Sequence, residues 1–113
     1  PNTYCKLILE NPCYIQKKQF LIIYFFIDSI LHFCYNSLEG CDFMLLDAER
    51  DGYVSYWPHL SRLLRINGGL LVVDKVISHA AEVKEFITLI QQDPRFIMMT
   101  VPIGAGLLMV EFR

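Results

Sequence analysis

The amino-acid sequence predicts an α/β fold over residues 42–113, with parallel strands and an antiparallel hairpin at the carboxyl end. Three observations predict it. Short, continuous apolar runs that end in aspartate are typical of parallel strands buried on both faces. Stretches with apolar residues at helical spacing separate these runs. Two β-rich runs joined by a short turn of glycine and proline complete the chain.

The first predicted strand is Phe43–Leu46, which ends at Asp47, and a charged loop over residues 47–53 follows it. The next stretch is predicted to be a helix, because its apolar residues recur at helical spacing: Trp57, Leu60, Leu63 and Leu64. Pro58 is expected in the first turn of this helix, where its missing N–H costs little. The sequence Asn-Gly-Gly at residues 67–69 is expected to end the helix.

The remaining elements repeat this pattern. Leu70–Asp74 is the second predicted strand, and it also ends in aspartate. A second helix is predicted from apolar residues at positions i, i+3, i+4 and i+7, with Ser78 as its N-cap and Asp93-Pro94 at its end: Val83, Phe86, Ile87 and Ile90. Phe96–Val101 and Leu107–Phe112 are predicted strands, and the segment between them is short enough for an antiparallel hairpin.

Residues 1–41 differ in composition from the rest of the chain. They contain all four cysteines, whereas all five arginines lie in residues 42–113. Phe20–Ile27 is an unbroken apolar run, but Asp28 and His32 follow before the roughly 20 apolar residues of a transmembrane helix are reached. We interpret this run as a buried helix or strand. The alternative is a small membrane-anchored protein held by residues 20–35.

The overall composition excludes several classes of protein. A chain of 113 residues fits one small domain rather than a multidomain enzyme, and a hydrophobic content of 54% excludes disorder. A net charge of −2 gives no electrostatic reason to expect a nucleic-acid partner. The cysteines contain no C-x-x-C pair, which disfavours a zinc or iron–sulfur site, and nothing else in the sequence indicates the secreted context of a disulfide framework. We therefore interpret them as reduced thiols of a cytoplasmic protein.

Two aspartates at strand ends are the main candidates for chemistry. Asp47 and Asp74 each follow a predicted parallel strand, so both are expected at the same edge of the sheet, where ligands of open α/β sheets bind. Two carboxylates there can hold a hard cation such as Mg²⁺, which would orient a substrate hydroxyl and lower its pKa. The alternative is that each aspartate is a solvated loop residue or a helix cap.

Several segments together resemble a known family. Residues 42–53 and 63–74, with residues 93–96 and 102–107 of the closing hairpin, are similar to the carboxyl-terminal half of class I S-adenosylmethionine-dependent O-methyltransferases. The similarity is to the catechol and caffeoyl-CoA O-methyltransferase type, and it covers about residues 39–113. It implies a Rossmann-like, mostly parallel sheet of seven strands with a reversed final strand. It also implies methyl transfer from S-adenosylmethionine to a hydroxyl of a small molecule.

The resemblance implies roles for particular residues. Asp47 and Asp74 fall at the family's two metal-binding acids, and Asp47, Ala48 and Tyr53 fall at its cofactor site. Arg50 falls where many members have a lysine that acts as general base or positions the hydroxyl. A guanidinium stays protonated, so Arg50 is expected to position an oxyanion or carboxylate rather than to act as a base.

Lys75 departs from the family pattern, which has an asparagine directly after the second acid. An ammonium cannot ligate Mg²⁺ and repels it. Either the site has lost its metal, or Lys75 replaces the metal's positive charge beside the substrate oxygen. A desolvated lysine acting as the base and a plain surface lysine are further alternatives.

Three weaker candidates could line the substrate pocket or touch the substrate. Trp57 lies just beyond the loop that follows the first strand, and Tyr53 lies at the end of that loop. For both aromatic residues the alternative is packing in the core. His79 follows the second strand, and for it the alternative is a structural or solvated histidine.

Class I methyltransferases bind the cofactor with a Gly-rich turn after their first strand and an acid after their second strand. Neither has a counterpart here: the first glycine is Gly40, and the roughly 40 residues before it do not show the strand pattern. We therefore interpret the chain as an atypical apolar segment, residues 1–41, followed by the carboxyl-terminal half of a methyltransferase-like domain, residues 42–113. The missing half would leave an open sheet edge prone to association. The alternative to an enzyme is a non-catalytic remnant that pairs with another chain, or with a second copy, through that edge.

Overall fold

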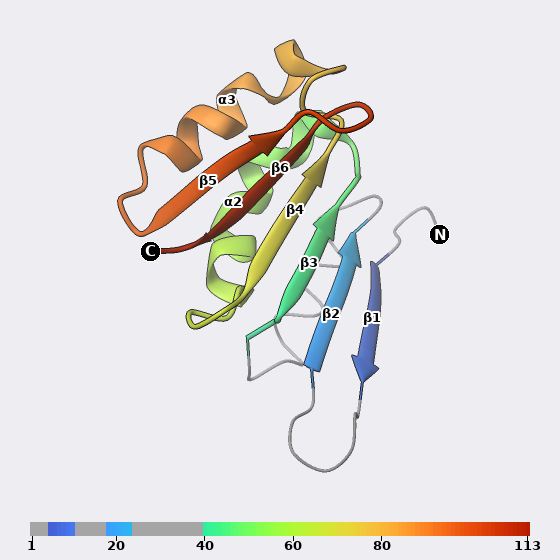
Figure 1. The fold of residues 1–113 in the computed structure, drawn as a ribbon, viewed down its shortest axis with the longest axis vertical. Helices are drawn as coiled ribbons and strands as arrows, with labels where there is room; N and C mark the ends of the chain where they lie inside the picture. Colours follow the sequence, from blue (N-terminus) through green and yellow to red (C-terminus); the bar gives the residue numbers. More distant parts are fainter. Residues whose placement is uncertain (1–4, 11–17, 24–39) are drawn as a thin grey trace.

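The computed structural model describes residues 5–10, 18–23 and 40–113. Their strands form one six-stranded sheet in the order β1-β2-β3-β4-β6-β5 (Figure 1). Strands β2, β3 and β4 are mutually parallel, β1 is antiparallel to β2, and β6 is antiparallel to both β4 and β5. The strands are β1 (Cys5–Glu10), β2 (Lys18–Ile23), β3 (Phe43–Leu46), β4 (Leu70–Asp74), β5 (Phe96–Val101) and β6 (Leu107–Phe112).

The predicted α/β fold with its carboxyl-terminal antiparallel hairpin is confirmed. All four strands predicted in residues 42–113 have the expected bounds. The sheet also extends into the first 41 residues, since β2 pairs with β3 along Phe20–Ile23. The apolar run of residues 20–27 is thus a strand over its first four residues, and the other four lie outside the described residues. Strand β3 therefore does not form the open sheet edge that the sequence predicted, because β2 pairs with it. The edge strand on this side is β1.

Two helices cover one face of the sheet, as Figure 1 shows. Helix α2 (Tyr53–Leu63) follows a single 3-10 turn, η1 (Arg50–Gly52), and helix α3 (Ala80–Gln91) follows β4. Helices α2 and α3 have 11 and 12 residues. Within residues 5–10, 18–23 and 40–113, no helix has the length and apolar character needed to cross a membrane.

The predicted start of the first helix is wrong. Helix α2 begins at Tyr53, so Pro58 lies in its interior and not in its first turn. Proline has no N–H to donate to the Val54 carbonyl, which weakens the helix at this point. Burial of one helix face offsets that loss, because Tyr53, Trp57 and Leu60 are all at most 5% exposed.

Two predicted helix ends also differ from the structure. Helix α2 ends at Leu63 instead of at the Asn-Gly-Gly sequence, because Leu64 is extended and forms a parallel bridge with Cys41. The N-cap of α3 is His79 and not Ser78. The hydroxyl of Ser78 lies 2.8 Å from Nδ1 of His79 and makes no capping hydrogen bond to the helix.

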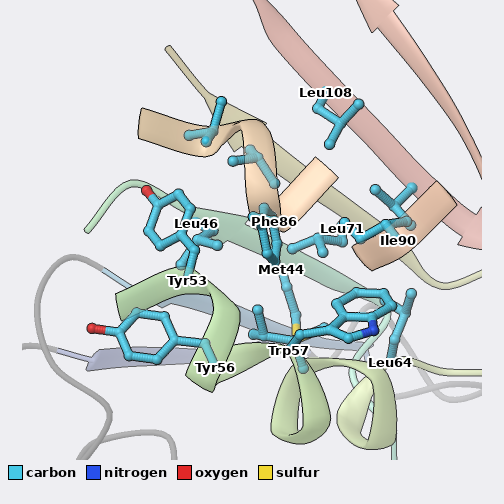
Figure 2. Close-up of a cluster of buried hydrophobic side chains, with 14 of the residues drawn as sticks. Met44, Leu46, Tyr53, Tyr56, Trp57, Leu64, Leu71, Phe86, Ile90 and Leu108 are labelled. Atoms are coloured by element: carbon cyan, nitrogen blue, oxygen red, sulfur yellow. The ribbon is translucent and has the colours of Figure 1, made fainter. Parts of the chain in front are cut away.

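The core lies between the two helices and the sheet (Figure 2). At its centre the ring of Phe86 on α3 meets Tyr53 and Trp57 on α2, with ring centroids 5.3 and 6.0 Å apart. The ring of Trp57 also contacts the ring of Phe96 on β5 edge to face, with ring centroids 4.9 Å apart. Alternate residues of the central strands complete the cluster: Met44, Leu46, Leu71, Val73, Leu108 and Val110. This packing fixes both helices against the sheet, and with them the loops that follow β3 and β4.

Candidate functional site

The loops after β3 and β4 bring two carboxylates together. The parallel register pairs Leu46 with Val73, so Asp47 and Asp74 stand at the carboxyl ends of adjacent strands. The prediction that they share one edge of the sheet is confirmed. Their side chains are 28% and 35% exposed, so both carboxylates are within reach of solvent and of a ligand.

The ammonium of Lys75 lies between these two carboxylates. Its Nζ donates to both carboxylate oxygens of Asp47, at 2.9 and 3.1 Å, and lies 3.7 Å from Oδ2 of Asp74. The Lys75 side chain is 36% exposed. A positive charge therefore lies between the two carboxylates, closer to Asp47 than to Asp74. The structure thus places Lys75 within the site and not as an isolated surface lysine.

The backbone of Lys75 has an unusual conformation that helps to place this charge. Lys75 has a φ of 65° and is the one described non-glycine residue with positive φ. Its N–H donates to Oδ1 of Asp74 at 2.8 Å. The left-handed region costs an L-residue other than asparagine or aspartate roughly 1 kcal/mol. The turn that brings Lys75 into the site is therefore mildly strained.

The surroundings of Lys75 keep it protonated. The hydrogen bond to Asp47 raises the pKa of the Lys75 ammonium above its ordinary value, and the negative charges of Asp47 and Asp74 add to this effect. Partial desolvation and the charge of Arg50 oppose it without reversing the direction. The raised pKa disfavours the alternative in which Lys75 is a general base, because a protonated ammonium cannot accept a proton.

Arg50 and His79 lie beside the first turn of α3 and are linked through Glu82. Arg50 Nε donates to Oε2 of Glu82 at 3.1 Å, and His79 Nε2 lies 4.0 Å from Oε1 of the same carboxylate. Glu82 is not among the residues that the sequence predicts for the site. An acid in the first turn of a helix is common because the helix dipole favours it there, so its position alone carries no signal for a site.

Tyr53 and Ala48 support the site from within the core. Tyr53 is fully buried; its hydroxyl accepts a hydrogen bond from the Ala48 N–H at 3.0 Å and donates one to the Ala48 carbonyl at 3.2 Å. The Tyr53 hydroxyl and the backbone groups of Ala48 are thereby hydrogen-bonded to each other and not to a cofactor. The pair instead anchors the backbone directly after Asp47.

The structure places Trp57 in the core, which was the alternative to a place in a substrate pocket. Trp57 is 5% exposed, and its ring contacts Phe86 and Phe96. Helical spacing cannot distinguish a pocket residue from a core residue, because both lie on the apolar face of the helix.

The residues at this edge of the sheet do not fit a bound Mg²⁺. Within the described part of the chain, no group of three or more histidine, cysteine, aspartate or glutamate side chains is arranged to hold a metal ion. The position between Asp47 and Asp74 is taken by the Lys75 ammonium. We therefore assign no reaction step to a metal ion.

The turn of the carboxyl-terminal hairpin supports the segment that follows Lys75. The carbonyl of Gly106 accepts a hydrogen bond from the Val76 N–H at 3.2 Å, and the carbonyl of Ala105 accepts bonds from the N–H groups of Ile77 and Ser78. The segment after β4 is thus held by residues some 30 positions later in the chain. No local sequence pattern signals this contact.

Gly106→Ala is expected to lower the free energy of unfolding by about 2 kcal/mol, because Gly106 has a φ of +96° and an added Cβ would clash with the Ile77 side chain. Gly68→Ala is the matched control, since Gly68 has a φ of +91° but open space around it. The control is expected to lose only about 1 kcal/mol. Urea unfolding of both variants measures the difference, and equal losses would show that the contact with Ile77 is unimportant.

Comparison with known proteins identifies the family. The O-methyltransferase family matches residues 29–112 of the chain. No curated protein sequence matches the chain. Among solved structures, the O-methyltransferase of Bacillus cereus in complex with SAH (S-adenosylhomocysteine) is similar at 20% identity and a TM-score of 0.64, over 77% of this chain and 47% of that one. The SAH-bound methyltransferase of Podospora anserina is similar at 16% identity and a TM-score of 0.62, over 72% of this chain and 45% of that one.

These similarities agree with the observed architecture. The chain spans less than half of the length of both solved structures, and at these identities the likeness concerns the fold. The family match covers β3 to β6 with both helices, and hence the loops that carry Asp47 and Lys75. The parallel strands and the reversed last strand of the described sheet agree with what the resemblance implies, whereas its six strands and the antiparallel β1 differ from it. The chain belongs to the O-methyltransferase family.

Proposed function

We propose that this chain supplies the acceptor-binding part, and a part of the cofactor site, of an S-adenosylmethionine-dependent O-methyltransferase that acts on a hydroxyl group of a small molecule. The observation that carries the proposal is the position of the Lys75 ammonium, between two carboxylates at the carboxyl ends of parallel strands. Ligands of open α/β sheets bind at that edge. The family match over residues 29–112 supports the same reaction class.

Lys75 can bind the acceptor oxygen. An ammonium has three N–H donors, and the hydrogen bonds to Asp47 use at most two of them. The side chain is 36% exposed, so a remaining N–H can reach a ligand. This donor would stabilise negative charge on a hydroxyl oxygen as it loses its proton, which makes the oxygen a better nucleophile.

Asp74 can hold the hydroxyl proton. Its Oδ1 accepts the Lys75 N–H, whereas Oδ2 lies 3.7 Å from the ammonium, beyond hydrogen-bond distance. Oδ2 therefore retains lone pairs that can accept a hydrogen bond from the acceptor hydroxyl. Together, Oδ2 and the Lys75 ammonium would orient one hydroxyl at this edge of the sheet.

The charges near Asp47 fit the cofactor. S-adenosylmethionine, when bound, would supply a methyl group on a positively charged sulfur for transfer to the acceptor oxygen, with S-adenosylhomocysteine as the leaving group. The charge of Asp47 is paired with the Lys75 ammonium, but Glu49 and Asp51, which follow it, are exposed. These carboxylates offer the negative charge that a sulfonium favours.

Binding and turnover by the full chain test this proposal. Calorimetry should detect binding of S-adenosylmethionine and S-adenosylhomocysteine, and transfer of a labelled methyl group to simple phenols should follow. Asp47→Ala should lower kcat/KM about 100-fold, because it releases the Lys75 ammonium from its position. Glu85→Ala, at an exposed position on α3, is the control and should leave the rate unchanged. Absence of cofactor binding by the full chain would refute the proposal.

A further inference from the structure

We infer that Lys75 is a built-in cation of this site, so that the acceptor is held without a divalent metal ion and through a single oxygen. The inference deepens the proposed function by naming the class of acceptor. Its first part, the exclusion of metal ions, concerns the chain's own residues and is testable without turnover.

The geometry shows that the cation position is filled. Nζ of Lys75 is 2.9 Å from Oδ1 of Asp47 and 3.7 Å from Oδ2 of Asp74. A Mg²⁺ ion requires oxygen ligands at about 2.1 Å, and an ammonium nitrogen has no lone pair to offer it. A metal ion could enter between the carboxylates only if the ammonium left. The two positive charges would repel each other strongly at such a distance.

The backbone keeps the ammonium in this position. Lys75 directly follows Asp74, and its N–H is bonded to the Asp74 carboxylate at 2.8 Å. Its carbonyl accepts a hydrogen bond from the His79 N–H at 3.1 Å, which ties the same residue to the start of α3. Lys75 is thus anchored through its side chain, its N–H and its carbonyl. Displacing its ammonium would cost the hydrogen bonds to Asp47.

An internal ammonium and a metal ion select different acceptors. A divalent cation held by two carboxylates keeps several coordination positions open and can bind two adjacent oxygens of one ligand. With two N–H groups donated to the Asp47 oxygens, the Lys75 ammonium has one N–H donor left. One oxygen is therefore the natural ligand. The acceptor class that fits is a compound with a single hydroxyl, for which a second, adjacent hydroxyl brings no added affinity.

Metal titration tests the first part. The chain as it stands should bind neither Mg²⁺ nor Mn²⁺ at millimolar concentrations in calorimetry or in the Mn²⁺ electron spin resonance signal. Lys75→Asn should bind Mn²⁺ at least about tenfold more tightly, because it removes the charge and adds an amide oxygen. Asparagine also tolerates the positive φ of this position, so the variant is expected to fold.

Three further variants make the titration decisive. Lys75→Gln removes the same charge with a side chain closer in length, and it should also gain affinity for Mn²⁺. Lys84→Gln removes one charge from an exposed position on α3 and should not. Asp47→Asn in the Lys75→Asn background should abolish the gained binding. The inference would be overturned if the unaltered chain bound the metal ions, or if neither Lys75→Asn nor Lys75→Gln gained affinity for Mn²⁺.

Ligand binding tests the second part. In absorbance titrations, the unaltered chain should bind 4-nitrophenol and 4-nitrocatechol with affinities within about threefold of each other, because one N–H holds one oxygen. Lys75→Asn with Mg²⁺ should prefer 4-nitrocatechol by about tenfold. A catechol preference in the unaltered chain, or no binding of either compound, would overturn the assignment of the acceptor class. Failure of the proposed function is distinguishable, since it shows as missing cofactor binding while both titrations keep their expected outcomes.

Discussion

Phe86→Ala is expected to lower the free energy of unfolding by about 3–5 kcal/mol, the largest loss among the substitutions considered. Phe86 is 1% exposed and lies between the two helices and the sheet (Figure 2). Its ring contacts Tyr53 and Trp57 with centroids 5.3 and 6.0 Å apart. Alanine would remove the ring and leave a cavity that three separate elements would have to close. Chemical unfolding followed by circular dichroism measures the loss.

The control for this substitution is Thr88→Ala. Thr88 lies two residues further along α3, at an exposed position, and alanine is a good helix former. Its free energy of unfolding should therefore stay within about 0.5 kcal/mol of the original value. If Phe86→Ala costs no more than this control, then α3 is not packed on α2 as described.

The sequence predicted the strands of residues 42–113 better than the helix boundaries. Strands β3 and β4 are short apolar runs that end at a charged residue, so local composition marks where each strand ends. The bounds of α2 depend on distant contacts instead. Leu64 leaves the helix because it pairs with Cys41, and Tyr53 starts it because the core takes up its ring. Pairing between residues far apart in the chain is not visible in a periodic pattern.

The candidate site was predictable in its residues and not in its contacts. The parallel strands placed Asp47 and Asp74 at one edge, because every parallel strand ends on the same side. That Lys75 lies between them depends on a positive φ, which the sequence does not predict for a lysine. The link between Arg50 and Glu82 joins residues 32 positions apart and has no local signature.

Tyr53 connects the stability of the fold to the geometry of the site. Burial raises the pKa of Tyr53 from 10.0 to about 12, and the negative charge of Asp47 adds to this effect, while the hydrogen bond with Ala48 partly offsets it. The folded chain therefore holds this proton more tightly than the unfolded chain. Below pH 10 the tyrosine is neutral in both states, so its contribution to stability is fully present there.

The stability is expected to fall between pH 10 and 12, by about 1.4 kcal/mol per pH unit and about 3 kcal/mol in total from this group. Unfolding curves measured at each pH test this.

Tyr53→Phe is the control: it should be about 1–3 kcal/mol less stable at neutral pH, because the buried Ala48 N–H loses its partner. It should also lack this part of the alkaline loss. Since the same hydroxyl anchors the backbone after Asp47, its ionisation should loosen the Asp47–Lys75 contact as well. If the unaltered chain and Tyr53→Phe lost the same amount of stability between pH 10 and 12, then ionisation of Tyr53 would not be the cause of the loss.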